Sequence, residues 1–251
     1  MADELSGLTV LITGASGGLG AQFASALHGA GAQVVLAARR TTHTGSLAER
    51  LGDRAAAVPM DVTDEVSVIA GFNQAEARFG TVDVVVNNAG INAVGLATDI
   101  AVDDFDRVFA TNVRGMFLCA REAARRLIAA GSAETGQGRI INIASIAGQK
   151  VQPGVTAYNS SKAAAIMMTR SLAREWARKG INVNAICPGY IETDINSDWL
   201  SEEGGQRMVQ GFPRKRVMAL EDLDPMVLYL AGPKSVRVTG SIFTLDDGQS
   251  I

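Results

Sequence analysis

A glycine-rich stretch near the start of the chain limits the choice of fold more than any other segment. Residues 13–20 read TGASGGLG; they follow an apolar run at residues 8–12 and precede residues 21–27, whose apolar side chains recur at helical spacing. Glycines let the backbone turn tightly and approach a ligand, and the N-terminus of a helix offers free N–H groups to a phosphate. In this setting the stretch predicts a strand, a dinucleotide-binding turn and a helix, rather than a tight turn alone.

Strand and helix patterns alternate along the rest of the chain. We expect buried strands at residues 33–38, 55–60, 82–87, 140–145, 181–187 and 241–245. We expect helices at residues 65–79, 103–130, 156–179 and 222–230, a short one ending near residue 51, and a polar helical excursion at residues 197–212. Strands that are β-branched and apolar on both faces are typical of parallel sheets covered by helices on both sides. The pattern predicts an α/β fold: one doubly wound parallel sheet, a Rossmann fold, forming a single domain over residues 1–251.

Composition excludes several classes of partner. The net charge is −3 and there is no basic block, which argues against nucleic acid. No apolar run reaches the roughly 20 residues that cross a bilayer, and the N-terminus lacks a signal pattern. The two cysteines, Cys119 and Cys187, indicate a reducing compartment, and we expect Cys187 to be a buried packing residue. His28 and His43 are isolated, so no metal site is expected. These features predict a cytoplasmic protein without a membrane partner.

The end of the second strand favours one dinucleotide over the other. An acidic residue there binds the adenosine ribose of NAD, whereas arginine accommodates the 2′-phosphate of NADP. This chain has Ala38 followed by Arg39 and Arg40, so we expect NADP(H), with NAD(H) as the alternative. Asp61, at the end of the third strand, is in place to accept from the adenine amino group or to cap the next helix; one carboxylate can do both.

A second constellation carries acid–base chemistry. Tyr158 and Lys162 are four residues apart in a helical pattern, so both side chains lie on one face of the helix. An ammonium group beside a phenol lowers the tyrosine pKa from about 10, which makes proton exchange at neutral pH easier. Ser145 ends the preceding strand, where it would hydrogen-bond a substrate oxygen. Taken alone a Tyr–Lys pair is commonly surface packing; together with Ser145 and a cofactor fold it indicates a catalytic site.

With these motifs the chain resembles the short-chain dehydrogenase/reductase family over nearly its whole length. The matching motifs are residues 13–20, Asp61-Val62, Asn87-Asn88-Ala89-Gly90, Asn112, Ser145, Tyr158 with Lys162, and Pro188-Gly189. Their order and spacing match jointly. Within the family the chain is most similar to 3-oxoacyl-carrier-protein reductase-like members and to carbonyl reductase-like, sugar or alcohol dehydrogenase-like members.

The resemblance implies a role for each catalytic residue. Tyr158 would protonate the carbonyl oxygen as hydride arrives from the nicotinamide. Lys162 would lower the Tyr158 pKa and bind the nicotinamide ribose, while Ser145 would orient the carbonyl. Asn112 would hold a water that links Lys162 to solvent. The cofactor-binding residues would be Gly14, Ser16, Gly18, Leu19, Gly20, Arg39, Arg40, Asp61, Val62, Asn88, Ala89, Gly90, Tyr158, Lys162, Pro188, Gly189, Ile191 and Thr193.

We therefore expect an NADP(H)-dependent, metal-independent oxidoreductase that acts on a small carbonyl or secondary alcohol. Residues 190–216 would form a lid over the substrate, and the basic run at residues 213–216 would meet an anionic substrate or simply face solvent. Related carrier-protein reductases place basic residues around residues 129–138, where this chain has none. A 3-oxoacyl-thioester (ACP or CoA) reductase and a non-catalytic NADP-binding regulator are the alternatives. The resemblance also implies a homotetramer that packs through the helices at residues 103–130 and 156–179.

Overall fold

A seven-stranded parallel sheet forms the centre of the computed structural model, which describes residues 4–192 and 200–251. The strands are β1 (Thr9–Thr13), β2 (Gln33–Ala38), β3 (Ala55–Pro59), β4 (Val84–Asn87), β5 (Gly138–Ile143), β6 (Ile181–Pro188) and β7 (Ile242–Leu245). Their order in the sheet is β3-β2-β1-β4-β5-β6-β7, so the direction of winding reverses between β1 and β4. This is the doubly wound α/β fold that the sequence predicts, and ligands bind such sheets at the carboxyl ends of the strands near that reversal.

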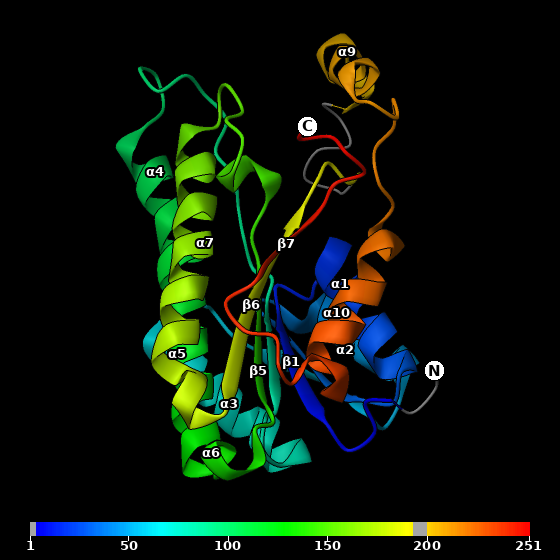
Figure 1. Cartoon of the computed structure of the whole chain (residues 1–251), viewed down its shortest axis with the longest axis vertical. Helices are drawn as coiled ribbons and strands as arrows, with labels where there is room; N and C mark the ends of the chain where they lie inside the picture. Colours follow the sequence, from blue (N-terminus) through cyan, green and yellow to red (C-terminus); the bar gives the residue numbers. More distant parts are fainter. Residues whose placement is uncertain (1–3, 193–199) are drawn as a thin grey trace.

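Helices cover both faces of the sheet, as Figure 1 shows. One face carries α1 (Gly18–Gly29), α2 (Thr41–Leu51) and α10 (Asp224–Ala231), whose apolar side chains pack with Val10 and Ile12 of β1. The other face carries α3 (Glu65–Phe79), α5 (Met116–Ala129) and α7 (Thr156–Trp176), which pack with Leu11 of β1. Successive side chains of β1 thus point to opposite faces and both are fully buried, which is why the strand is apolar without alternation.

Shorter elements complete the described chain. They are α4 (Val102–Phe109), α6 (Ser132–Thr135), α9 (Glu203–Gly211), the π turn η1 (Ala110–Gly115), and the 3₁₀ turns η2 (Ile146–Gly148), η3 (Ala177–Lys179), η4 (Leu220–Leu223) and η5 (Pro233–Ser235). No helix of the described segments is long and apolar enough to cross a membrane.

The single helix predicted over residues 103–130 is wrong, because η1 separates α4 from α5. Two contacts account for the π turn. Asn112 turns inward to hydrogen-bond the backbone of Ile91. Gly115 packs so closely on Val62 that an added Cβ would lie 2.8 Å from Val62 Cγ2. Both contacts join residues far apart in the sequence, so helical periodicity alone does not contain them.

Other differences from the predicted elements are small. β5 ends at Ile143, two residues before the predicted end, because Ser145 instead caps η2. Between the predicted helix at residues 103–130 and the predicted strand at residues 140–145 the structure contains the short helix α6, which was not predicted. Asp64, rather than Asp61, caps α3, since its side chain accepts the N–H of Val66. The predicted excursion at residues 197–212 lies partly outside the described residues, and its described part contains α9.

Candidate active site

The residues selected from the sequence lie beyond the carboxyl ends of β1 to β6 and on the helices beside them, toward the upper end of the sheet in Figure 1. The glycine turn after β1 lies against the segment after β4. Gly14 has φ +66° and an added Cβ would lie 2.8 Å from Ala89 Cα. At Gly20 an added Cβ would lie 2.3 Å from Gly14 O. Side chains at these two positions would force the turn open, so close approach requires glycine at both, and the positive φ is a second reason at Gly14.

Asn88 and Thr13 fasten this turn to β4. Asn88 Nδ2 donates to the carbonyl oxygens of Thr13 and Gly14, each at 3.1 Å. Thr13 Oγ1 in turn accepts the N–H groups of Asn88 and Ala89, each at 3.1 Å. The Asn88 side chain thus fixes the shape of the turn. Ala89 has a small side chain and Gly90 has none, so the side of the turn that would face a ligand stays open.

The start of α1 fits a pyrophosphate. Gly17 occupies the N-cap without a side-chain hydrogen bond, and the first turn of α1 carries no acidic residue. The first N–H groups of the helix therefore have no capping side chain and no carboxylate that would repel an anion. Gly18 has φ +51°, Leu19 is half-buried, and Ser16 is exposed on the turn. This cradle is where a bound dinucleotide would be held.

Charged groups lie at the neighbouring strand ends. Arg39 and Arg40 follow β2 and are both exposed. Asp61 Oδ1 accepts from the backbone N–H of Thr63 at 2.9 Å and from its hydroxyl at 2.8 Å. Burial acts to raise the pKa of Asp61, but the Thr63 hydrogen bonds and the positive charge of Arg39 outweigh it and lower the pKa below its ordinary value. Beside it Val62 is buried. The ends of β2 and β3 therefore present two guanidinium groups, Arg39 and Arg40, and the Asp61 carboxylate to a bound adenosine.

Ser145, Tyr158 and Lys162 meet beyond β5. Ser145 Oγ accepts a backbone N–H at 3.1 Å at the start of η2, and its side chain is hydrogen-bonded to the phenol of Tyr158. Lys162, one turn further along α7 than Tyr158, is buried. Its Nζ donates to the carbonyl oxygen of Ile143 at 2.8 Å and lies 5.5 Å from the centroid of the Tyr158 ring. The structure thus brings the three predicted catalytic side chains together.

The electrostatics of this group differ from the prediction. Burial raises the pKa of Tyr158, the Ser145 hydrogen bond lowers it only in part, and Cys187 adds to the rise. Burial also lowers the pKa of Lys162 to about 8. The predicted lowering of the Tyr158 pKa by Lys162 is therefore wrong for this structure. The physical reason is that Lys162 points its Nζ at a backbone carbonyl and is itself poorly solvated.

Asn112 is fully buried in η1, and all its hydrogen bonds go to the protein interior. Its Oδ1 accepts the N–H of Ile91 and its Nδ2 donates to Ile91 O, both at 2.9 Å. Nδ2 also donates to Ser161 Oγ at 3.0 Å. A Cβ added at Gly90 would lie 3.4 Å from Asn112 Oδ1 and 3.5 Å from Lys162 Nζ. The Asn112 amide and the Lys162 ammonium therefore approach the same point of the backbone.

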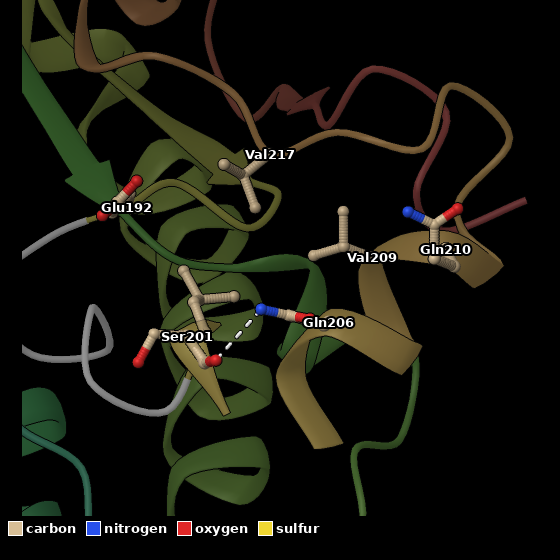
Figure 2. Close-up of a pocket in the computed structure, with 7 residues that line it drawn as sticks. Glu192, Ser201, Gln206, Val209, Gln210 and Val217 are labelled. Carbon is tan, nitrogen blue, oxygen red and sulfur yellow. Dashed lines mark hydrogen bonds between the residues drawn. The ribbon is translucent and has the colours of Figure 1, made fainter. Parts of the chain in front are cut away.

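The segment after β6 carries the remaining predicted residues. Gly189 follows Pro188, and a Cβ added there would lie 2.4 Å from Gln249 Oε1. Ile191 is buried and pairs with Met218 in an isolated bridge. Thr193 lies outside the described residues. Beyond Ile191 a cavity of about 370 Å³ lies beside α9, lined by Glu192, Leu200, Ser201, Gln206, Val209, Gln210 and Val217 (Figure 2). None of the predicted catalytic residues lines this cavity.

Two further side chains, Cys187 and Gln149, adjoin the catalytic group. Cys187 is buried as predicted, but its thiol lies close enough to Tyr158 and Lys162 to affect their pKa values. Burial raises the pKa of Cys187 itself to about 11. Gln149 Nε2 donates to Cys187 Sγ at 3.7 Å, and Gln149 Oε1 accepts from Thr244 at 3.1 Å. The position of Cys187 directly before Pro188-Gly189 was the available signal. Among the described residues no group of three or more His, Cys, Asp or Glu could hold a metal ion.

Comparisons with known proteins agree with this geometry. The family model described as short chain dehydrogenase matches residues 8–204. The chain is 36% identical over 245 residues to nodulation protein G of Rhizobium sp. (strain N33), covering 98% of each chain. A gluconate 5-dehydrogenase from Burkholderia cenocepacia J2315, solved in complex with NADP and tartrate, superposes with a TM-score of 0.92 at 32% identity, over 98% of this chain and 96% of that one. A 3-ketoacyl-(acyl-carrier-protein) reductase from Brucella melitensis, complexed with NADH, gives a TM-score of 0.89 at 32% identity, over 98% and 99%.

The burial of Lys162 predicts a dependence of stability on pH. Its pKa falls from 10.5 to about 8 on folding, so between these values the unfolded chain binds more protons and stability rises with pH. Relative to Lys162→Met without cofactor, the wild type should gain up to about 3 kcal/mol of unfolding free energy as the pH rises through this window. Urea unfolding of both proteins across the window measures the gain. A constant difference between them would contradict the low pKa.

Proposed function

The chain belongs to the short-chain dehydrogenase/reductase family, and we propose that it is an NADP(H)-dependent oxidoreductase that acts on a small carbonyl or secondary alcohol. The observation that carries the proposal is the meeting of Ser145, Tyr158 and Lys162 beside the glycine turn, at the carboxyl ends of the strands. A protein that only binds a dinucleotide needs the turn but has no use for an acid–base group beside it. The regulator is for this reason the weaker alternative.

The side chains divide the work of carbonyl reduction. The bound cofactor supplies hydride to the carbonyl carbon. Tyr158 gives its phenolic proton to the carbonyl oxygen, and its raised pKa keeps that proton in place at neutral pH until negative charge develops on the oxygen. Ser145, within hydrogen-bonding distance of the same phenol, donates to the oxygen and orients it. These hydrogen-bond donors polarise the carbonyl, so the mechanism requires no metal.

Lys162 and Asn112 restore the proton. The pKa of Lys162 near 8 allows it to gain and lose a proton close to neutral pH. Asn112 and Lys162 approach each other at Gly90, and we assign to this point a water that is held by both side chains. That water would carry protons from solvent to Lys162 and then to Tyr158. The Ile91 backbone holds the Asn112 amide in orientation through two hydrogen bonds.

The choice of NADP(H) rests on the end of β2. Ala38 supplies no carboxylate for a ribose, and the exposed side chains of Arg39 and Arg40 can bind a 2′-phosphate through charge-assisted hydrogen bonds. Similar proteins have been solved with NADP and with NADH, so NAD(H) is the alternative.

The substrate class follows from what the chain lacks. Residues 129–138 contain no Lys or Arg, which leaves no basic surface there for an acidic carrier protein. This favours a free carbonyl compound or a sugar-like substrate, in keeping with the similar gluconate 5-dehydrogenase. The similar 3-ketoacyl reductase supports the second candidate, a 3-oxoacyl-thioester reductase. Oxidation of gluconate with NADP⁺ or reduction of ethyl acetoacetate with NADPH would indicate the first class. Reduction of acetoacetyl-CoA with NADPH in preference to both would indicate the thioester reductase.

We also propose that residues 1–251 act as one domain in the cytoplasm, that residues 190–216 form its substrate side, and that the protein is a homotetramer. A mainly apolar groove between α4, η1, α5 and α7 supports this assembly. It is lined by Asp106, Phe109, Ala110, Val113, Arg114, Phe117 and Met168. Apolar side chains at such a surface suit burial against a second copy of the chain.

Tyr158→Phe tests the assigned mechanism. Loss of the phenolic proton should lower kcat for carbonyl reduction by about 100-fold or more, the range for general acid catalysis. NADPH affinity, measured by fluorescence titration, should change far less than kcat, because the contacts to the cofactor phosphates stay in place. Tyr229→Phe, on α10 away from the site, is the matched control and should leave kcat unchanged. Undiminished turnover by Tyr158→Phe would exclude the mechanism.

Arg39→Ala tests the cofactor assignment. Removing a charge-assisted contact to the 2′-phosphate should raise the KM for NADPH by about tenfold or more and leave the KM for NADH unchanged. Arg50→Ala, an exposed arginine at the other end of α2, is the control. The assignment fails if Arg39→Ala weakens both cofactors equally or leaves the preference as in the wild type.

A further inference from the structure

The side chain of Gln249, close to the C-terminus, hydrogen-bonds the backbone of Tyr190, which follows β6. Gln249 is 5% exposed. Its Oε1 accepts the N–H of Tyr190 at 2.5 Å, and its Nε2 lies 3.3 Å from Tyr190 O and 3.4 Å from Arg216 O. One amide group therefore satisfies both polar backbone atoms of Tyr190 and also reaches the returning chain at Arg216. In Figure 1 the C-terminus lies between β7 and α9.

The backbone around this amide is closely packed. Gly189 donates its N–H to Leu245 O at 2.9 Å. A Cβ at Gly189 would lie 2.4 Å from Gln249 Oε1 and 2.8 Å from Asp246 Cα. The glycine after Pro188 is thus explained by the C-terminal segment, which occupies the space that a side chain would need.

Both ends of the excursion at residues 190–216 are fastened at this point. Met218 donates its N–H to Tyr190 O at 2.9 Å, which joins the outgoing and returning chain. Asp247 pairs with Arg216 at 2.7 Å and with Arg214 at 3.2 Å. Asp247 adopts φ +52°, a left-handed conformation that is uncommon for a residue with a side chain. The basic run of residues 213–216 is in this way engaged with the C-terminal segment.

The contacts of Gln249 and Asp247 with Tyr190, Arg214 and Arg216 are called the clamp below. Tyr190 connects this clamp to the catalytic group. Ala144 donates its N–H to Ile186 O at 2.8 Å, so the end of β6 lies beside Ser145, and Tyr190 follows two residues after β6. In keeping with this position, burial raises the pKa of Tyr190 and the nearby Tyr158 raises it further. The Tyr190 ring also contacts Phe212, with centroids 5.5 Å apart and planes tilted by 37°. A substrate bound at Tyr158 would therefore meet an aromatic wall made of Tyr190 backed by Phe212.

We propose that Gln249 is a positioning residue that holds Tyr190 against the substrate beside Tyr158. The proposal rests on the proposed function, because only a substrate that reacts at Tyr158 would meet Tyr190. It assigns an active-site task to the segment after β7, and it identifies Tyr190 as a substrate contact whose placement depends on a side chain far away in the sequence.

Trypsin digestion of the protein without substrate tests the clamp. Gln249→Met keeps the volume and removes the three hydrogen bonds of the amide. Cleavage after Arg214, Lys215 or Arg216, identified by mass spectrometry, should become about fivefold faster or more, because local opening governs cleavage. Gln137→Met, the same change at an exposed glutamine before β5, is the control. Its cleavage at residues 214–216 should be as fast as in the wild type. An unchanged rate in Gln249→Met would overturn the clamp.

Kinetics of the same variants test the positioning of the substrate. With ethyl acetoacetate and NADPH, Gln249→Met should raise the ketone KM by about fivefold while kcat stays within about twofold, since Tyr158 itself is untouched. An unchanged ketone KM, or a fall in kcat alone, would overturn the role of Gln249 in substrate contact. If the wild type reduces no ketone, the proposed function fails, and the substrate contact of Tyr190 fails with the proposed function. The digestion still decides whether the clamp exists.

Discussion

The hydrogen bonds between Asn88 and Thr13 hold the ends of β4 and β1 together, and the cofactor cradle depends on them. At this point the sheet changes its direction of winding, and doubly wound sheets bind their ligands at such points. Asn88 satisfies the carbonyl groups of the turn from behind, and Thr13 accepts two N–H groups from the β4 segment. Each such bond contributes about 1 kcal/mol, and together they keep the helix N-terminus of α1 directed at the ligand.

Two polar side chains buried behind the cradle are also held in fixed orientations by hydrogen bonds to the backbone. Lys162 and Asn112 are almost completely buried, which would be costly for unpaired groups. The structure gives each a backbone partner, Ile143 for Lys162 and Ile91 for Asn112. The π turn η1 is the local distortion that brings Asn112 to its partner, and π turns inside helices are frequent at functional sites. The fold thus accepts a disrupted helix in order to orient one amide.

Local sequence signals predicted much of the fold, because glycine and capping residues mark the ends of elements directly. The strand at residues 33–38 and the helix at residues 65–79 are found with the predicted bounds. Contacts between distant residues were beyond such signals: the π turn needs Ile91, and the clamp needs Gln249 opposite Tyr190. The catalytic side chains were chosen correctly as neighbours, but the Tyr158 pKa was not, because burial is a tertiary property. The roles of the site residues stay predictions.

In the proposed reaction hydride passes directly between the cofactor and a substrate that Tyr158 protonates. The most direct measurement uses NADPH deuterated at both C4 positions with ethyl acetoacetate, and mass spectrometry of the hydroxy ester. We expect one deuterium on the carbinol carbon of the wild-type product and almost no product from Tyr158→Phe. A product without deuterium, or an equal yield from the variant, would contradict it.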